Sequence, residues 1–236
     1  MMKTTLSPTL KKIGALAAAV GLTLGAATQP ASAADGDTQT FLLTSDHCTG
    51  GCGPQTGGFG QVLVTDSAGG ALTFDVTLFN GNQFVSSGLD LTFAFDLVGS
   101  PTITYTGLTS GFTIPGGIGP QQTAGTYHMN GFGDFEYGVE WGGQNGGPPN
   151  SFNGALHFVI TSNGGALSLS SLETNGVGGP FFVADIYSAT TFNTGAVDAS
   201  AGGVPTSVPE PETYAMLLAG LGMMGFVARR RKNKTS

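Results

Sequence analysis

The chain has 236 residues, 40 of them glycine, and its formal net charge of −7 hides a strong segregation of charge. All eight basic residues lie within the first twelve and the last eight positions, so residues 34–208 hold thirteen carboxylates, no lysine or arginine, and a formal charge of −13. A body without cations cannot neutralise phosphate, which excludes nucleic acid and anionic lipid surfaces as its ligands.

Residues 1–33 have the pattern of a secretory signal peptide. Three lysines precede an apolar run that ends near residue 27, and Ala-Ser-Ala at 31–33 supplies small residues at the cleavage positions. This order of charge, apolar run and small residues predicts export, with signal peptidase cleaving after Ala33. A buried N-terminal helix is the alternative interpretation.

Residues 34–198 predict one Gly-rich, acidic all-β domain. Apolar and polar residues alternate with a period of two between Gly-rich turns; in residues 89–97, for example, Leu91, Phe93 and Phe95 share a face opposite Thr92 and Asp96. We expect an antiparallel β-sandwich of jelly-roll-like type. The predicted strands are 40–44, 61–66, 72–79, 89–97, 102–108, 133–141, 155–161, 167–172 and 181–188, and residues 66–70 predict a hairpin turn.

The stretch Asp46-His47-Cys48-Thr49-Gly50-Gly51-Cys52 contains the two cysteines of the chain. In an exported protein, this pair predicts a local disulfide between Cys48 and Cys52. A metal site on His47, Cys48 and Cys52 would need a further ligand, and four residues is not a strong zinc spacing. A catalytic cysteine is a third interpretation, with less support.

Residues 133–141 suggest a binding site. As one strand they would place Asp134, Glu136 and Glu140 on one face, where hard oxygen ligands without competing cations suit Ca²⁺. The alternatives are solvated acids on a core strand, or a carboxylate pair of a glycoside hydrolase. On the other face, Tyr137 and Trp141 could form a sugar-stacking platform or simply pack in the core.

Other functional patterns are weak or missing. Threonines alternate along residues 102–106, and ordered threonine arrays can face a repetitive ligand such as ice, but one strand is not an array. No Gly-Xaa-Ser-Xaa-Gly, His-Glu-Xaa-Xaa-His or phosphate-binding loop occurs, so we do not expect an enzyme. His157 lies among apolar residues and predicts an ordinary strand histidine.

The C-terminal region divides into four parts. Residues 199–208 predict a Gly-, Pro- and Ser-containing linker, followed by Pro209-Glu210-Pro211. Residues 213–228 are largely apolar and, as a helix, would span about 24 Å, a marginal membrane crossing. Arg229, Arg230, Arg231 and Lys232 form a basic stop that would stay in the cytoplasm and place the body outside.

Residues 208–236 resemble the PEP-CTERM sorting signal of Gram-negative bacteria, in which Pro-Glu-Pro, a short apolar helix and a basic cluster occur in this order. The resemblance implies an exosortase, which is thought to cleave near Pro-Glu-Pro. The same type of tail is also described as an ice-binding protein C-terminal domain, which implies nothing about the body. Residues 131–139 look like those of PEP-CTERM proteins without a known activity, and this likeness assigns no functional residues.

Together these features predict an exported cell-surface or extracellular-matrix protein with no catalysis of its own. The resemblance implies sorting by exosortase, association with exopolysaccharide and biofilm, and transient anchoring in the inner membrane by residues 213–228. A carbohydrate-binding module, with or without Ca²⁺, is the alternative; a secreted hydrolase and an ice-binding protein rank lower. No cofactor is expected other than this optional Ca²⁺.

Overall fold

The computed structural model describes residues 36–116, 119–143 and 147–200. Within these ranges the chain forms antiparallel β-strands and one 3-10 helix of three residues, which confirms the predicted all-β antiparallel class. No helix in the described ranges is both long and apolar enough to cross a membrane. The predicted signal peptide, the Pro-Glu-Pro motif, the apolar segment 213–228 and the basic stop lie outside the described residues.

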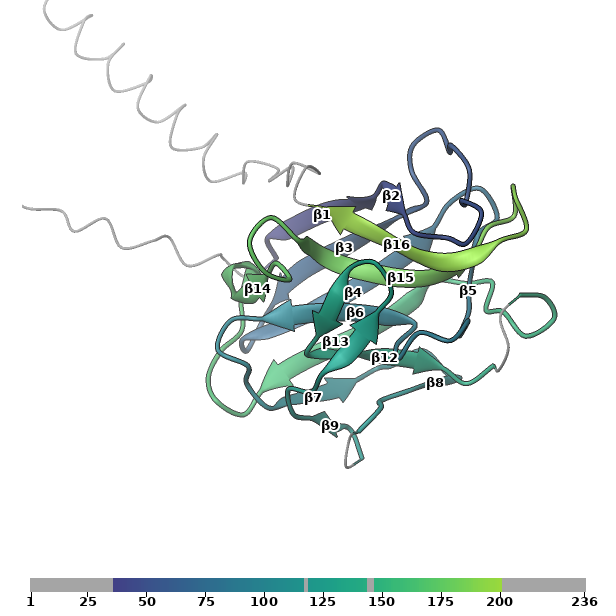
Figure 1. Cartoon of the computed structure of the whole chain (residues 1–236). Coiled ribbons are helices and arrows are strands. Elements are labelled where there is room, and N and C mark those ends of the chain that lie inside the picture. Colours follow the sequence, from purple (N-terminus) through teal and green to yellow (C-terminus); the bar gives the residue numbers. More distant parts are fainter. Residues whose placement is uncertain (1–35, 117–118, 144–146, 201–236) are drawn as a thin grey trace, which may run out of the picture. The chain divides into compact units, whose positions relative to one another are not determined.

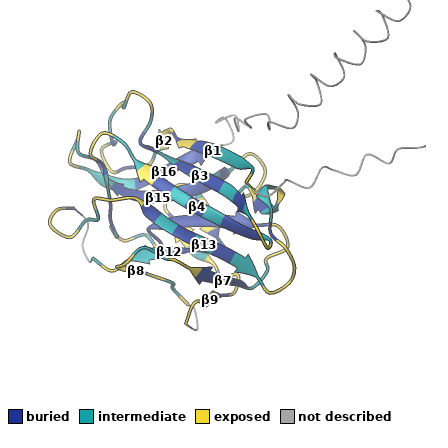
Figure 2. Cartoon of the chain, turned by 180° about the vertical axis from the view of Figure 1, so that it is seen from behind, coloured by how far each residue is buried: buried dark blue, intermediate teal, exposed yellow. Residues whose placement is uncertain are grey.

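Two large sheets make up the body, one behind the other in Figure 1. The six-stranded sheet contains, in spatial order, β1 (Thr38–Leu43), β3 (Gly60–Ser67), β4 (Ala71–Leu78), β13 (Leu156–Ser162), β7 (Ile103–Thr106) and β9 (Gln121–Gln122). Its strands alternate between buried and partly exposed residues, as the banded colouring of Figure 2 shows. This alternation is the pattern expected of a sheet that has one face on the core.

The eight-stranded sheet is less regular. Its spatial order is β2 (Ser45–Asp46), β16 (Thr194–Ser200), β15 (Pro180–Tyr187), β6 (Phe93–Leu97), β12 (Tyr137–Trp141) and β8 (Phe112–Thr113), with β5 (Gln83–Phe84) beside β15 and β14 (Leu172–Glu173) beside β6. The first three residues of β12 and all five of β6 are buried.

Phenylalanine rings join the two sheets across the main core. Phe74 of β4 lies 5.2 Å from Phe95 of β6 and 6.1 Å from Phe182 of β15, measured between ring centroids. Phe41 of β1 lies 4.8 Å from Phe182. All four side chains are at most 2% exposed. Burying large rings of this kind supplies most of the apolar free energy that holds two sheets together.

A separate hairpin covers part of the outer face of the eight-stranded sheet. It consists of β10 (Tyr127–Met129) and β11 (Gly133–Phe135), which pair antiparallel. Met129 and Phe135 pack with Ala94 of β6 and Val183 of β15 in a second, smaller core. We refer to this element as the β10–β11 hairpin; it explains why the neighbouring strands are buried on both faces.

The structure corrects three strand predictions. The strand expected at 89–97 begins only at Phe93 and is not half-exposed, because the β10–β11 hairpin covers its second face. The strand expected at 133–141 is interrupted at Glu136, whose N–H bonds to Asp96 Oδ1 at 2.7 Å. The strand expected at 167–172 is replaced by the 3-10 helix Leu169–Ser171, where Ser168 N–H donates to Ser171 Oγ, and strand pairing begins only at Leu172. Serine side chains compete with strand pairing in this way.

One boundary also differs from the sequence prediction, and one predicted turn is confirmed. Strand β16 was not predicted, because its small residues give a weak period-two pattern; it runs two residues into the predicted linker, and Ala199 is buried. The predicted hairpin turn at 66–70 is confirmed between β3 and β4. Gly69 and Gly70 have φ of +82° and +73°, the left-handed backbone region that favours glycine in such turns.

Candidate functional site

The predicted disulfide joins Cys48 and Cys52. Backbone and side-chain bonds fix the loop that it closes: Cys52 N–H donates to Asp46 Oδ1, and Gly51 O accepts from Thr191 Oγ1 at 3.0 Å and from Asn193 Nδ2 at 2.7 Å. The disulfide loop is therefore attached to the turn between β15 and β16. Because both sulfurs are bonded to each other, neither the metal nor the nucleophile interpretation of these cysteines holds.

A buried amide and hydroxyl network supports this attachment. Gln55 Oε1 accepts from Asn82 Nδ2 at 2.7 Å, and Ser188 Oγ donates to Cys52 O at 2.9 Å. Asn82 is 3% exposed and Ser188 is fully buried. Buried polar groups that find partners rigidify a structure, so we assign these residues a structural role.

Two of the motifs noted in the sequence meet in space. The His47 ring of the disulfide loop lies 4.4 Å from the Phe132 ring, between centroids, at the tip of the β10–β11 hairpin. Gly131 leaves no room for a Cβ beside the His47 ring. The Asp-His-Cys and Gly-Phe-Gly segments thus dock on each other, which the sequence alone did not indicate.

The three predicted Ca²⁺ ligands do not form one site. Asp134 Oδ1 contacts His128 Nδ1 at 2.8 Å within the β10–β11 hairpin, Glu136 Oε1 accepts from Ser100 Oγ at 2.8 Å, and Glu140 lies on β12. Among the residues described, no group of three or more His, Cys, Asp or Glu side chains is placed to hold a metal ion. The expectation failed because the strand that was to align the three acids is broken at Glu136.

The predicted stacking platform is also wrong. Tyr137 is fully buried: its ring stacks on Phe95 and its hydroxyl donates to Pro101 O at 2.6 Å. Trp141 packs against Phe112 and Phe152, with ring centroids 5.2 and 5.0 Å away, and its Nε1–H donates to Asn150 O. Both residues therefore belong to the core and its rim and cannot form a shared flat surface for a sugar.

Two buried carboxyl groups have perturbed acidities. Burial raises the pKa of Asp96 to about 6, and the nearby Glu136 and Glu173 carboxylates add to this rise. Burial also raises the pKa of Asp185 to about 6, although Ser87 opposes the shift with hydrogen bonds of 2.6–2.8 Å from its N–H and its Oγ. These groups make the free energy of folding depend on pH.

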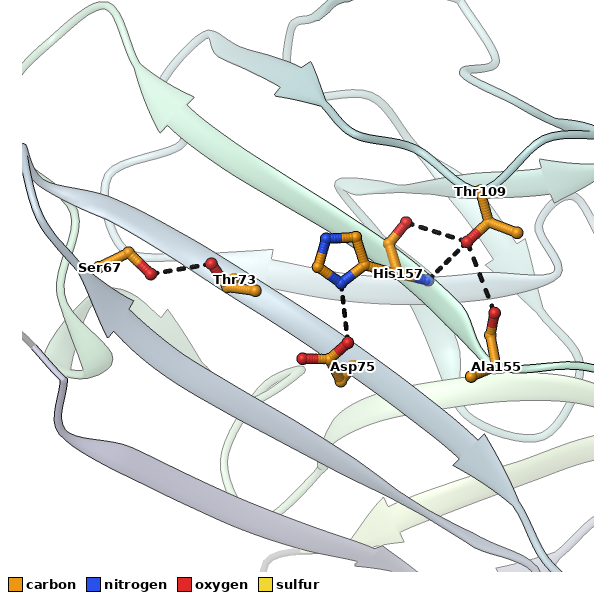
Figure 3. Close-up of polar contacts among 6 residues, drawn as sticks. All are labelled: Ser67, Thr73, Asp75, Thr109, Ala155 and His157. Carbon is orange, nitrogen blue, oxygen red and sulfur yellow. Dashed lines mark hydrogen bonds and ion pairs between the residues drawn. The ribbon is translucent and has the colours of Figure 1, made fainter.

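The outer face of the six-stranded sheet carries hydroxyl groups and one ion pair; Figure 3 shows the contact of Ser67 with Thr73 and the pair of His157 with Asp75. His157 Nδ1 lies 2.7 Å from Asp75 Oδ1 across neighbouring strands, and both side chains are nearly half exposed. Thr38, Thr65 and Thr73 are register neighbours on β1, β3 and β4. The next row begins with Thr40 on β1 but continues with Leu63, Asp75 and His157, so the hydroxyl array is interrupted.

One exposed aromatic residue was missed in the sequence. Phe192 lies in the turn between β15 and β16 with 73% of its surface exposed, and its ring centroid is 6.3 Å from that of Tyr187. The available signal was a phenylalanine inside the polar run Thr-Thr-Phe-Asn-Thr, where no strand pattern requires an apolar side chain.

Comparison with known proteins gives a match in the C-terminal region of the chain. The family model for the PEP-CTERM protein-sorting motif matches residues 207–232. No curated protein and no solved structure gives a significant match to the chain. The matched segment contains Pro209-Glu210-Pro211 and Arg229-Arg230-Arg231 in the order that the sequence suggested. The chain carries a PEP-CTERM protein-sorting motif at its C-terminal end.

Proposed function

We propose that this chain is a non-enzymatic exported protein that exosortase sorts to the cell surface, where it associates with the exopolysaccharide matrix. The observation that carries the proposal is the sorting motif at residues 207–232, which indicates export, processing by exosortase and delivery to the surface. The matrix role and the lack of catalysis go beyond that motif.

The composition of the body supports the matrix role. The body holds thirteen carboxylates and no lysine or arginine, and the carboxylates outside the core give a hydrated, self-repelling surface, which suits a protein held in a polymer gel without aggregation. The absence of the common nucleophile and metal motifs from the sequence supports a non-catalytic role. The rings that join the two facing sheets support our assignment of a jelly-roll-like β-sandwich.

We also propose the route by which the protein reaches the surface. Signal peptidase removes residues 1–33, residues 213–228 hold the chain in the inner membrane, and exosortase then acts near Pro209-Glu210-Pro211. Calcium enters this proposal only as a counterion between exposed carboxylates, because the three acids once expected to share an ion have separate places in the fold.

The matrix role is tested by comparing cells that make exopolysaccharide with otherwise identical cells that do not. We expect the protein to remain with the first cells after washing and to appear in the medium of the second. Treatment with a calcium chelator shows whether carboxylate bridging contributes to retention. Equal partition between cells and medium in both strains would refute association with the polymer, while leaving surface sorting intact.

A further inference from the structure

Phe192 adopts a backbone conformation that bulky residues avoid. Its φ is +63°, in the left-handed region, where the Cβ of any residue other than glycine strains the backbone. Asparagine tolerates this region, which accounts for Asn80 at φ +57°. A phenylalanine with 73% of its surface exposed gains little from burial to offset such a cost. The choice of residue is thus unfavourable for folding.

The surrounding turn holds Phe192 in place. Phe192 N–H donates to Ser188 O at 2.8 Å, and Ser188 N–H donates to Asn193 O at 2.8 Å. The side chains of Thr191 and Asn193, the residues before and after Phe192 in the chain, both donate to Gly51 O of the disulfide loop. The aromatic ring is therefore presented from a preorganised turn, which lowers the entropy that a ligand must overcome to bind it.

The turn that carries the ring is uncharged and polar. The turn sequence Ser188-Ala-Thr-Thr-Phe-Asn-Thr194 offers hydroxyl and amide groups, and the Tyr187 ring lies beside Phe192. Val177, the most exposed large apolar residue in the described chain, precedes the opposite end of β15 and so does not extend this surface. Protein interfaces need a larger continuous apolar centre than two rings provide.

We propose that Phe192, with Tyr187 beside it, is a stacking contact for a sugar ring of a neutral polysaccharide. The apolar C–H face of a pyranose packs on an aromatic face, and the neighbouring hydroxyl and amide groups suit its ring hydroxyls. The body supplies no lysine or arginine for an acidic sugar. The inference deepens the proposed matrix role and rests on it.

The test uses the exported protein recovered from producing cells and measures its retardation in gels that contain a polymer. The probes are hydroxyethyl cellulose, the purified exopolysaccharide of the producing bacterium, and alginate as an acidic polymer. We expect retardation by at least one of the first two and none by alginate. Normal mobility with both of the first two, for a protein that is present on the cell surface, would overturn the stacking contact without touching the sorting assignment.

The decisive variant is Phe192→Gly, because glycine adopts this φ without strain. We expect at least tenfold weaker binding together with a Tm equal to or above that of the unaltered protein, a combination that damage to the fold cannot produce. Phe192→Tyr should retain binding, and Val177→Ala is the matched control for loss of an exposed apolar side chain. Binding by Phe192→Gly within twofold of the unaltered protein would contradict the proposal.

Discussion

Asp185 is fully buried on β15, and its carboxylate accepts hydrogen bonds from the N–H and the hydroxyl of Ser87. Burial holds the pKa of Asp185 near 6 in the folded state, above its ordinary value of 3.8. Between about pH 4 and pH 6 the folded chain therefore binds more protons than the unfolded chain, so the free energy of unfolding falls as pH rises through this window. Asp96 contributes in the same direction.

We expect Asp185→Asn to raise the free energy of unfolding at pH 7.5 by about 2 kcal/mol, because the amide keeps a bond to Ser87 and carries no charge. The Tm should rise by roughly 4–8 °C at this pH and by much less at pH 4, where the folded carboxyl is protonated and the unfolded one is only about half ionised. Thermal unfolding at both pH values measures this, with Glu140→Gln as a control on the same sheet. A Tm gain of equal size at pH 4 and pH 7.5 would show that the buried charge is not its source.

A second prediction concerns Tyr137, for which the sequence suggested a place in a surface stacking platform and which the structure places in the core. Tyr137→Phe should cost about 1 kcal/mol, because it removes the hydrogen bond to Pro101 O and keeps the stacked ring. Polysaccharide binding should not change. Denaturant unfolding and gel retardation measure the two effects; a lost retardation in a stable Tyr137→Phe protein would restore Tyr137 as a ligand contact.

At the scale of elements, the disulfide loop and the turn between β15 and β16 act as one unit. The bonds from Thr191 and Asn193 to Gly51 O connect them. Two buried side chains add further bonds: Ser188 donates to Cys52 O, and Asn82 donates to Phe59 O. Because the loop is short, the disulfide removes little entropy from the unfolded chain and so stabilises the fold modestly. Its larger effect is to hold the turn that carries Phe192.

The double variant Cys48→Ser/Cys52→Ser should lose about 2 kcal/mol of stability by the loop-entropy relation, or roughly 4–8 °C in Tm. A reducing agent should lower the Tm of the unaltered protein by a similar amount and leave the double variant unchanged. If the turn and loop are coupled, the double variant also binds polysaccharide more weakly. Unaltered Tm and binding after complete reduction would show that the loop is not structural.

The β10–β11 hairpin is the element that sequence reasoning could not place. Its residues carry a strand pattern, and a strand was expected at 133–141, but nothing in the local pattern says that they cover a neighbouring sheet. Met129→Ala should cost about 2–5 kcal/mol, since Met129 is fully buried against Ala94 and Val183. Chemical denaturation gives the value, and a loss below 0.5 kcal/mol would mean that the hairpin is not packed as described.

Across the whole molecule, the predictable features were those set by local pattern. The alternating runs 61–66, 72–79 and 155–161 predicted three strands of the six-stranded sheet. The predicted export of the protein and the close spacing of its two cysteines predicted the Cys48–Cys52 disulfide. The candidate site was not predictable in this way. Whether Tyr137 is buried or Phe192 exposed depends on which strands pair and on what covers them, and a period of two is the same in both cases.

The central claim is that exosortase sorts and cleaves this protein at the motif in residues 207–232. Because the motif lies at the C-terminal end, cleavage there changes the mass of the protein measurably. Intact-mass spectrometry of the protein recovered from the cell surface or the medium reads both ends of the chain at once. We expect an N-terminus at Ala34 and a C-terminus near Pro209–Pro211, with residues 213–236 removed. A surface form that ends at Ser236 would contradict sorting by exosortase cleavage.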